Sequence, residues 1–273
     1  MSSAEQEPES KSSQNIAVYQ EADKRFSQAA QGYVSSESHA KGAELKLMVA
    51  LAEAEMNLRG KRLLDVATGG GHVALAFARA GAKVTVTDLS LKMLQTADDF
   101  ISSQGAQVDC VQAAAESLPF DDNRFDIVTC RIAAHHFAQP AAFLHSAARV
   151  LKKGGILLLV DNISPEDEAL AQTMNHIEKM RDPSHVMAYS VLQWSQWLAE
   201  AGFAISYLER FKRAKDYEIW FRRMGESEGA RGMLEQLVLA LPQHFKDYFE
   251  VKSQGDKLLS LSHEVICLKA KKF

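Results

Sequence analysis

A buried strand that enters a glycine-rich turn is indicated by one stretch, Leu63-Leu64-Asp65-Val66-Ala67-Thr68-Gly69-Gly70-Gly71. The helix-length segment after it predicts that the turn opens a helix, the geometry in which bare backbone approaches a nucleotide cofactor. Gly69, Gly71 and Ala74 also satisfy the spacing of the dinucleotide-binding fingerprint, and Asp88 lies near the distance expected for a ribose contact. An NAD(P)-dependent oxidoreductase is therefore one hypothesis for this chain.

Short apolar runs alternate with helix-length segments on both sides of this turn. The runs are RLLDVA, KVTVTD, QVDCVQ, FDIVTC and GILLLVD, with FAISYLE and HEVICLKA as two later strand candidates. Such alternation is typical of βαβ units, which build a parallel sheet. We therefore expect an α/β protein with a doubly wound sheet.

The remaining segments are expected to surround this sheet. Residues 1–15 are rich in Ser, Glu and Gln and predict a disordered tail. Helical spacing over residues 16–57 predicts a helical cap in front of a cofactor-binding core at 58–163. Residues 164–273 should supply lid helices and the last strands, so that 16–273 form a single domain.

Two helices are expected in this last part of the chain, one from Pro165 to Met180 and one that Ser190 opens and Gly202 ends. The segment 216–251 is interpreted as an insertion that packs over the edge of the sheet or over the site.

Composition excludes several classes of partner. The formal net charge of −4 arises from 31 Lys and Arg against 35 Asp and Glu. The two signs are mixed along the chain, so no basic segment is indicated that would bind nucleic acid or an anionic membrane. Cys110, Cys130 and Cys267 are far apart and form no CxxC pair, so neither a disulfide framework nor a structural zinc site is indicated. We expect a small-molecule partner and no metal.

No apolar segment of the length of a membrane span is present, and the first residues lack an apolar signal region. These features predict a cytoplasmic protein without a membrane anchor.

The position of Asp65 distinguishes between nucleotide cofactors. In the dinucleotide pattern the glycines follow the strand directly, whereas here a carboxylate stands four residues before Gly69. A carboxylate suits the ammonium group of a cofactor that carries an amino acid, and it would repel a pyrophosphate.

With these motifs the sequence resembles the class I S-adenosylmethionine-dependent methyltransferases over residues 26–203. It is most similar to the small-molecule branch that contains the ubiquinone/menaquinone biosynthesis C-methyltransferases. The resemblance implies a Rossmann-like, seven-stranded, mostly parallel sheet with an antiparallel last strand and helical cap elements. Further matching motifs are Ala114-Ala115-Glu116-Ser117-Leu118-Pro119-Phe120, Phe125-Asp126-Ile127-Val128, the 131–137 segment and the 149–155 turn.

The resemblance also implies roles for individual residues in binding S-adenosylmethionine. The turn from Asp65 to Gly71 should hold the methionine end, with Ala67 where the family usually has its first glycine, and Asp88 should accept hydrogen bonds from both ribose hydroxyls. Ala114 occupies the position of the usual adenine-reading aspartate. The cofactor residues expected in this way are Asp65, Ala67, Gly69, Gly71, Asp88, Leu89, Met93, Ala115, Glu116 and Arg131.

Candidate acceptor and catalytic residues follow the fourth and fifth strands. His135 and His136 come at the carboxyl edge of the sheet, where open α/β folds bind ligands. Adjacent side chains point apart, so we expect one of them, His136 in preference, to face the pocket, with structural hydrogen bonding as the alternative. Tyr33, Arg181 and His185 are the expected substrate-binding residues, and a surface loop is the alternative for the last two.

The function predicted from the sequence is S-adenosylmethionine-dependent transfer of a methyl group to a small organic molecule. Whether oxygen, carbon or nitrogen accepts the methyl group stays open, as does the oligomeric state. Two alternatives remain at this point: a catalytically silent protein that binds S-adenosylmethionine, and the NAD(P)-dependent oxidoreductase.

Overall fold

A mixed sheet flanked by helices forms the body of the protein, which a computed structural model describes at residues 7–35, 42–223 and 227–273. The strand order is β3-β2-β1-β4-β5-β8-β6, and the short β7 pairs only with β8. All neighbouring pairs from β3 to β5 are parallel, whereas β8 is antiparallel to both β5 and β6. The strands are β1 (Arg62–Val66), β2 (Lys83–Asp88), β3 (Asp109–Gln112), β4 (Phe125–Arg131), β5 (Leu151–Ile163), β6 (Phe203–Asp216), β7 (Lys252–Gln254) and β8 (Lys257–Lys272).

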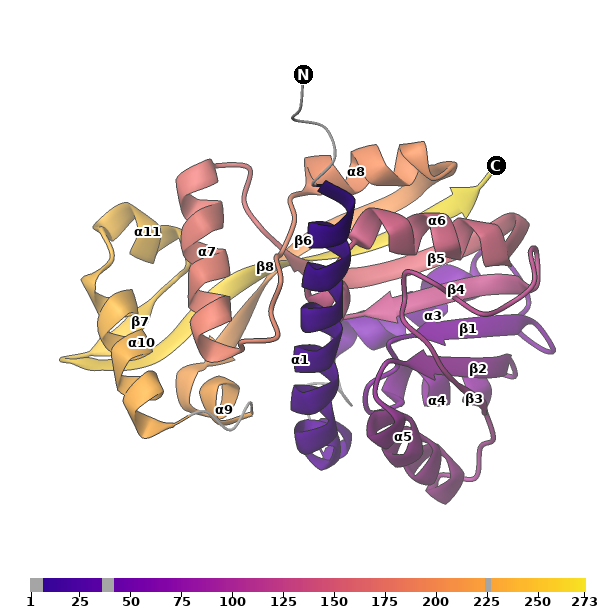
Figure 1. Ribbon diagram of the computed structural model, residues 1–273, viewed down its shortest axis with the longest axis horizontal. Coiled ribbons are helices and arrows are strands. Elements are labelled where there is room, and N and C mark those ends of the chain that lie inside the picture. Colours follow the sequence, from indigo (N-terminus) through magenta and orange to yellow (C-terminus); the bar gives the residue numbers. More distant parts are fainter. Residues whose placement is uncertain (1–6, 36–41, 224–226) are drawn as a thin grey trace.

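Helices cover both faces of this sheet (Figure 1). They are α1 (Glu7–Ser35), α3 (Ala43–Glu53), α4 (His72–Arg79), α5 (Leu91–Ser103), α6 (Pro140–Val150), α7 (Glu168–Arg181), α8 (Val191–Glu200), α9 (Tyr217–Arg222), α10 (Glu228–Ala240) and α11 (Gln243–Tyr248), with a 3₁₀ turn η1 (Ala134–His136).

Alternation along the strands produces two apolar cores, one on each face. On β1, Leu64 packs with α6 and α8, while its neighbour Leu63 packs with α3, α4 and α5. On β5, Leu157 and Leu158 divide in the same way. Successive side chains of a strand point to opposite faces, so the unbroken apolar runs are those of strands buried on both sides. The predicted α/β class and the antiparallel last strand are confirmed.

The pairing of β6 with β8 continues far beyond the end of β5. It runs from Phe203 opposite Lys272 to Asp216 opposite Ser260, whereas β5 reaches only to Ile163 opposite Glu264. The extension carries the outer lobe, which we define as α7, α9, α10, α11, β7 and the outer ends of β6 and β8. It lies on the left in Figure 1 and has its own apolar core from α7, α9, α10 and β8.

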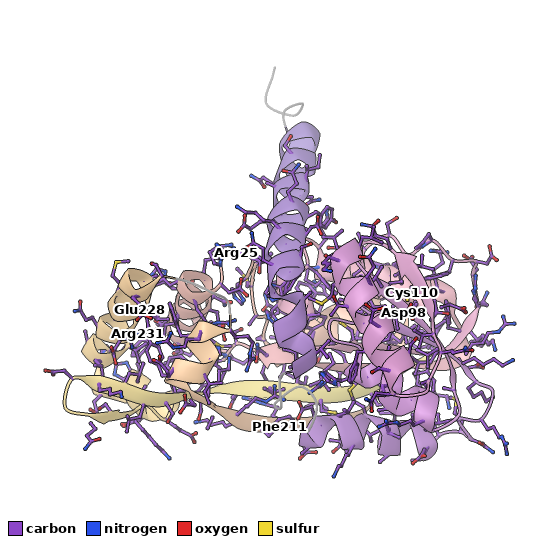
Figure 2. All side chains as sticks on the ribbon, turned by 90° about the horizontal axis from the view of Figure 1, so that it is seen from below. Arg25, Asp98, Cys110, Phe211, Glu228 and Arg231 are labelled. Atoms are coloured by element: carbon purple, nitrogen blue, oxygen red, sulfur yellow. The ribbon has the colours of Figure 1, made fainter. Side chains whose placement is uncertain are left out.

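Between the outer lobe and the main sheet lies α1, whose amino-terminal turns project beyond the body of the molecule (Figure 2). This helix packs against α5. The Ser27 and Ser90 hydroxyl oxygens, 2.7 Å apart, link it to the turn that begins α5. The cap predicted from the amino-terminal helical pattern therefore includes a helix that lies across the carboxyl ends of the parallel strands (Figure 1).

The structure differs from the sequence-based predictions at several boundaries. Residues 7–15 belong to α1 and are not a loose tail, while residues 1–6 lie outside the described residues. Glu, Gln and Lys are good helix formers, and lengthening an anchored helix costs little once its first turn exists. The helix after β5 begins at Glu168, because Asp167 and not Pro165 caps it. Ser190 opens α8 with a capping box, as predicted.

A buried carboxylate, Glu178 of α7, connects α7 to β6 and β8 within the outer lobe. Lys215 of β6 lies 2.6 Å from Oε1, Arg181 lies 3.1 Å from Oε2, and Nδ1 of His263 on β8 lies 2.7 Å from Oε1. Burial alone would raise the pKa of Glu178, but these three groups hold it well below its ordinary value. Glu178 is therefore an anion at neutral pH and joins three elements.

Removing this carboxylate should destabilise the fold strongly. Glu178→Gln leaves Lys215 buried without its counter-ion and removes one of the two carboxylates beside Arg181, a change that typically costs about 3 to 5 kcal/mol. We expect that loss in the free energy of unfolding, measured by urea titration. Glu200→Gln removes an exposed carboxylate on α8 and should change stability by less than about 0.5 kcal/mol. Equal effects of the two substitutions would contradict the role of Glu178.

Candidate active site

A cavity opens at the carboxyl ends of β1, β2 and β4, underneath α1. Its volume is about 950 Å³ including the open mouth. The chain runs outward from β1 to β3 and then returns to place β4 on the other side of β1, so the strand order reverses between β1 and β4. Ligands of open α/β sheets bind at such a reversal.

Most residues predicted to bind the cofactor line this cavity. They are Asp65, Ala67, Gly69, Asp88, Leu89, Met93, Ala115, Glu116 and Arg131. Gly71 is not part of the lining. It has a φ of +79°, and a Cβ there would approach Cδ1 of Ile101 to 2.9 Å. Gly71 therefore allows the turn to close against α5 and acts on the cavity only through the backbone.

Asp65 holds β1 and β4 together at the floor of the cavity. Its two carboxylate oxygens accept hydrogen bonds from the hydroxyls of Thr129 and Thr68, each at 2.7 Å. Burial raises the pKa of Asp65 to about 6, against the effect of these hydrogen bonds. At neutral pH the group is a buried carboxylate that suits a cationic ligand group.

Backbone strain occurs at the ends of both strands beside the cavity. Ala67, after β1, has a φ of +53°, and Ile132, after β4, also has a φ of +53°. Left-handed backbone costs a residue with a Cβ about 1 to 2 kcal/mol, and a β-branched residue rarely adopts it. Such strain tends to persist at ligand sites, where the surrounding structure fixes it. The left-handed backbone also explains why glycine would be the easier residue at position 67.

Asp88 closes β2 and turns its carboxylate to the cavity. Oδ2 accepts a hydrogen bond from the Gly69 N–H at 3.1 Å, and Oδ1 accepts one from the Ser90 N–H at 3.0 Å. Burial raises the pKa of Asp88 to about 6, and nearby Asp65 adds to this. The carboxylate retains lone pairs for two further donors, as vicinal ribose hydroxyls require.

Residues of α1 that the sequence analysis missed form the roof. Tyr19, Ala22 and Phe26 line the cavity from one face of the helix. Burial and the neighbouring Glu116 raise the pKa of Tyr19 to about 12. Their spacing of three and four residues predicts a buried helical face, but only the fold reveals what that face covers. Ala114 also lines the cavity, so no carboxylate is present at that position.

Arg131 reaches the cavity wall from the end of β4. Its Nη2 donates a hydrogen bond of 2.8 Å to Oε1 of Glu44 on α3, and Arg213 of β6 donates to the same oxygen. Burial lowers the pKa of Arg131, against the attraction of Glu44. The structure thus gives Arg131 a structural partner in addition to its place on the wall.

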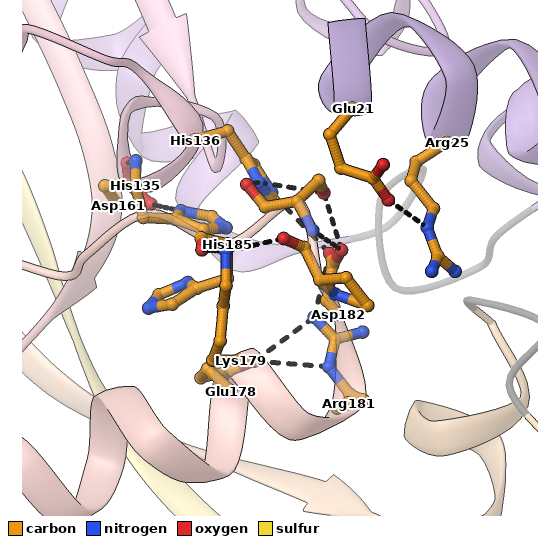
Figure 3. A network of polar contacts seen from close by, with 12 residues as sticks. Glu21, Arg25, His135, His136, Asp161, Glu178, Lys179, Arg181, Asp182 and His185 are labelled. Atoms are coloured by element: carbon orange, nitrogen blue, oxygen red, sulfur yellow. Dashed lines mark hydrogen bonds and ion pairs between the residues drawn. The ribbon is translucent and has the colours of Figure 1, made fainter. Parts of the chain in front are cut away.

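The two adjacent histidines face in different directions. His136 lines the cavity, where its ring meets Phe26 of α1 edge-on at 4.9 Å between centroids. His135 is not part of the lining. It is hydrogen-bonded to Asp161 of β5 through Nδ1 at 2.5 Å and through its backbone N–H at 3.0 Å (Figure 3). Burial and the neighbouring His135 lower the pKa of His136 to about 4.

The pKa of His135 responds to a different balance. Burial lowers the pKa of His135, but the hydrogen-bonded Asp161 raises it by a larger amount. The pKa therefore lies above its ordinary value. His135 therefore anchors η1 to β5 and matches the structural alternative. His136 is the histidine available to a ligand.

Arg181 and His185, expected to contact the substrate, lie in the buried polar network of Figure 3. Arg181 pairs with Glu178 and stacks over the Trp220 ring at 4.8 Å. Nε2 of His185 donates a hydrogen bond of 2.8 Å to Asn175, and burial lowers the pKa of His185 to about 2. Neither residue is among those lining the cavity.

Tyr33, the third residue expected at the acceptor site, belongs to α1. Its side chain lies outside the described residues.

Known methyltransferases resemble this chain in sequence and in fold. The family model of the methyltransferase domain matches residues 64–159. An uncharacterized methyltransferase, YcgJ of Bacillus subtilis, is 37% identical over 201 residues, which cover 73% of this chain and 78% of the relative. A solved structure from Bacillus halodurans, described as that of a methyltransferase, is 42% identical in sequence. Its TM-score is 0.81, and the match covers 85% of this chain and 99% of that one.

The chain belongs to the class I S-adenosylmethionine-dependent methyltransferases. A ubiquinone/menaquinone biosynthesis C-methyltransferase of Azotobacter vinelandii is 36% identical to this methyltransferase over 119 residues, 42% of this chain and 47% of that one. The cofactor is S-adenosylmethionine, and the donor set fits it. Asp65 offers a carboxylate for an ammonium group, and Asp88 offers one for two hydroxyls.

In the described part of this methyltransferase, no helix combines the length and the apolar character that crossing a membrane requires. No group of three or more His, Cys, Asp or Glu side chains at 7–35, 42–223 and 227–273 is arranged to hold a metal ion.

Asp88 should contribute strongly to cofactor affinity. Asp88→Ala removes a charged acceptor of two hydrogen bonds, so we expect binding of S-adenosylhomocysteine to weaken by about 1.5 to 3 kcal/mol in calorimetry. Asp99→Ala, which removes an exposed carboxylate on α5, is the matched control and should leave the dissociation constant unchanged. An unaltered dissociation constant in folded Asp88→Ala would place Asp88 outside the site.

Cofactor affinity should also fall with pH near 6. The carboxylate form of Asp88 accepts the hydroxyl hydrogen bonds, and its raised pKa of about 6 means that protonation begins well above the ordinary range of aspartate. Affinity should therefore be complete above pH ~7 and drop about tenfold by pH ~5. Calorimetry at both values tests this, and Asp88→Asn should reduce the difference. A wild-type affinity independent of pH over this interval would refute the prediction.

Proposed function

We propose that this methyltransferase transfers the methyl group of S-adenosylmethionine to a small organic acceptor and that His136 receives the acceptor's proton. The observation that carries the proposal is the position of His136 on the wall of the cavity that Asp65 and Asp88 also line. The acceptor would lie beneath α1, between the cofactor and the η1 turn.

S-adenosylmethionine supplies an electrophilic methyl group on a sulfonium, which a nucleophile displaces in line. The contribution of the chain is therefore mainly to position the reactants and to exclude water. Tyr19, Ala22 and Phe26 of α1 roof the cavity and limit its access to solvent. A concave cavity of this size, on a protein of net negative charge, favours a small molecule over a polyanion.

His136 is able to accept a proton at physiological pH because its ring is neutral there. Burial and His135 lower its pKa to about 4, so the ring keeps a free lone pair well below pH 7. An ordinary histidine would lose activity below pH ~6. The lowered pKa moves that limb of the rate profile toward pH 4, below the range in which Asp88 titrates.

The first experiment supplies S-adenosylmethionine labelled in the methyl group together with a metabolite extract. Label should appear in a small molecule in the presence of the protein, be absent without the protein and be reduced with Asp88→Ala. Binding of S-adenosylmethionine without movement of label into any extract component would favour the silent binding protein.

His136→Ala should separate chemistry from cofactor binding. We expect kcat to fall by about 10²-fold with the acceptor that the labelling experiment identifies, because proton transfer from the acceptor loses its partner. The dissociation constant for S-adenosylhomocysteine should stay close to that of the wild type. His145→Ala, on the exposed side of α6, is the control. Full turnover by His136→Ala would show that His136 lines the cavity but takes no part in proton transfer.

A further inference from the structure

The turn that follows α7 is fixed by the carboxylate of Asp182. Oδ1 accepts two hydrogen bonds from Ser184, one from the backbone N–H at 3.0 Å and one from the hydroxyl at 2.5 Å. Asp182 is completely buried. The local geometry is that of an aspartate turn, in which a side chain holds the backbone two residues further on.

This turn carries a carbonyl group to the ring of His136. The Ser184 carbonyl oxygen lies 3.0 Å from Nδ1 of His136 (Figure 3). A carbonyl can only accept a hydrogen bond, so Nδ1 must carry the proton. The Ser184 hydroxyl, 3.3 Å from Nδ1, already donates its hydrogen to Asp182. The neutral ring is therefore the tautomer in which Nε2 has a free lone pair.

The second oxygen of Asp182 faces that free nitrogen. Oδ2 lies 3.9 Å from Nε2 of His136, a distance too long for a hydrogen bond. Within the described chain, Oδ2 has no hydrogen-bond partner, and a guanidinium nitrogen of Arg181 lies 3.6 Å away. A buried carboxylate oxygen is thus held opposite the nitrogen that would become positively charged on taking up a proton.

We propose that Asp182 is a positioning residue for His136, holding the ring in the tautomer with a free Nε2 and stabilising the imidazolium that forms when the acceptor's hydrogen is taken. The inference rests on the proposed function and extends it to the acceptor, whose nucleophilic atom must carry a hydrogen, as a hydroxyl or an amine does.

The O–H or N–H bond of the acceptor breaks, and its electron pair stays on the atom that forms the new bond to the methyl carbon. The proton forms a bond to Nε2 of His136, which then faces Oδ2 of Asp182 with a positive charge. The electron pair of the broken carbon–sulfur bond stays on the cofactor sulfur.

The groups around His136 are consistent with this division of roles. His135 on the same turn lowers the pKa of His136, whereas Asp182 and Asp161 raise it. The His185 ring lies 6.4 Å away, and α1 presents the Phe26 edge and, farther off, the Glu21–Arg25 ion pair (Figure 3). Asp182 is the acidic group that faces Nε2 at 3.9 Å.

The test combines two substitutions that remove different parts of Asp182. Asp182→Asn keeps an oxygen for the Ser184 hydrogen bonds but places a neutral amide opposite Nε2. We expect the Nδ1–H tautomer to persist and kcat to fall tenfold or more, while KM and the dissociation constant for S-adenosylhomocysteine hold. Asp182→Ala removes the turn as well, so the tautomer should become mixed.

The tautomer is measured by ¹⁵N NMR of histidine-labelled protein, with the His136 signals assigned from His136→Gln. Asp99→Asn, which makes the same chemical change at an exposed carboxylate on α5, is the control. It should preserve both the tautomer and kcat.

Two results would overturn the inference: an Nε2–H tautomer in the wild type, or unchanged kcat and tautomer in both Asp182 variants. The wild-type spectrum decides even if a variant fails to fold. A wild type that binds S-adenosylmethionine and methylates nothing would refute the proposed function separately, because the NMR readout requires no turnover.

Discussion

The hydrogen bond from Thr129 to Asp65 joins β4 to β1, the two strands between which the strand order reverses. The geometry of the site depends on this contact. Parallel strands normally meet through their backbone ladder, and here a buried side-chain contact of 2.7 Å adds to it at the carboxyl edge. The glycine turn leaves β1 on one side of this contact, while Arg131 and the η1 turn leave β4 on the other. Cofactor and acceptor groups therefore extend from a single rigid floor, which is what a reaction governed by positioning requires.

The parts of the site that could be predicted are those in which the backbone itself dictates the residue. Gly69, Asp88 and the alternation of strands and helices follow from turn geometry and strand burial, and in the structure Gly69 and Asp88 line the cavity. The roof could not be predicted, because the spacing of Tyr19 and Phe26 shows only that one helical face is buried. The orientation of His136 within a 3₁₀ turn likewise depends on Ser184, which is remote in sequence.

The misplaced expectations share a physical cause. Arg181 and His185 lie at the end of α7 and in the polar turn after it, a composition that usually indicates solvent or a ligand, yet their partners, Glu178 and Asn175, are residues of α7. Lys215 and His263 meet Glu178 only because of the register between β6 and β8, which no local pattern encodes. The outer lobe thus holds charged side chains in buried ion pairs and hydrogen bonds.

The central position of β8 has a consequence for how the protein is made. This strand follows the other seven in chain order, yet it lies between β5 and β6 and supplies Val265 and Ile266 to opposite faces of the sheet. While the ribosome still holds β8, one long edge of β5 and the whole inner edge of β6 have no neighbour, so neither core can close. The nascent chain must remain incompletely packed until β8 has left the ribosome, and for that interval its exposed strand edges are targets for chaperones or for aggregation.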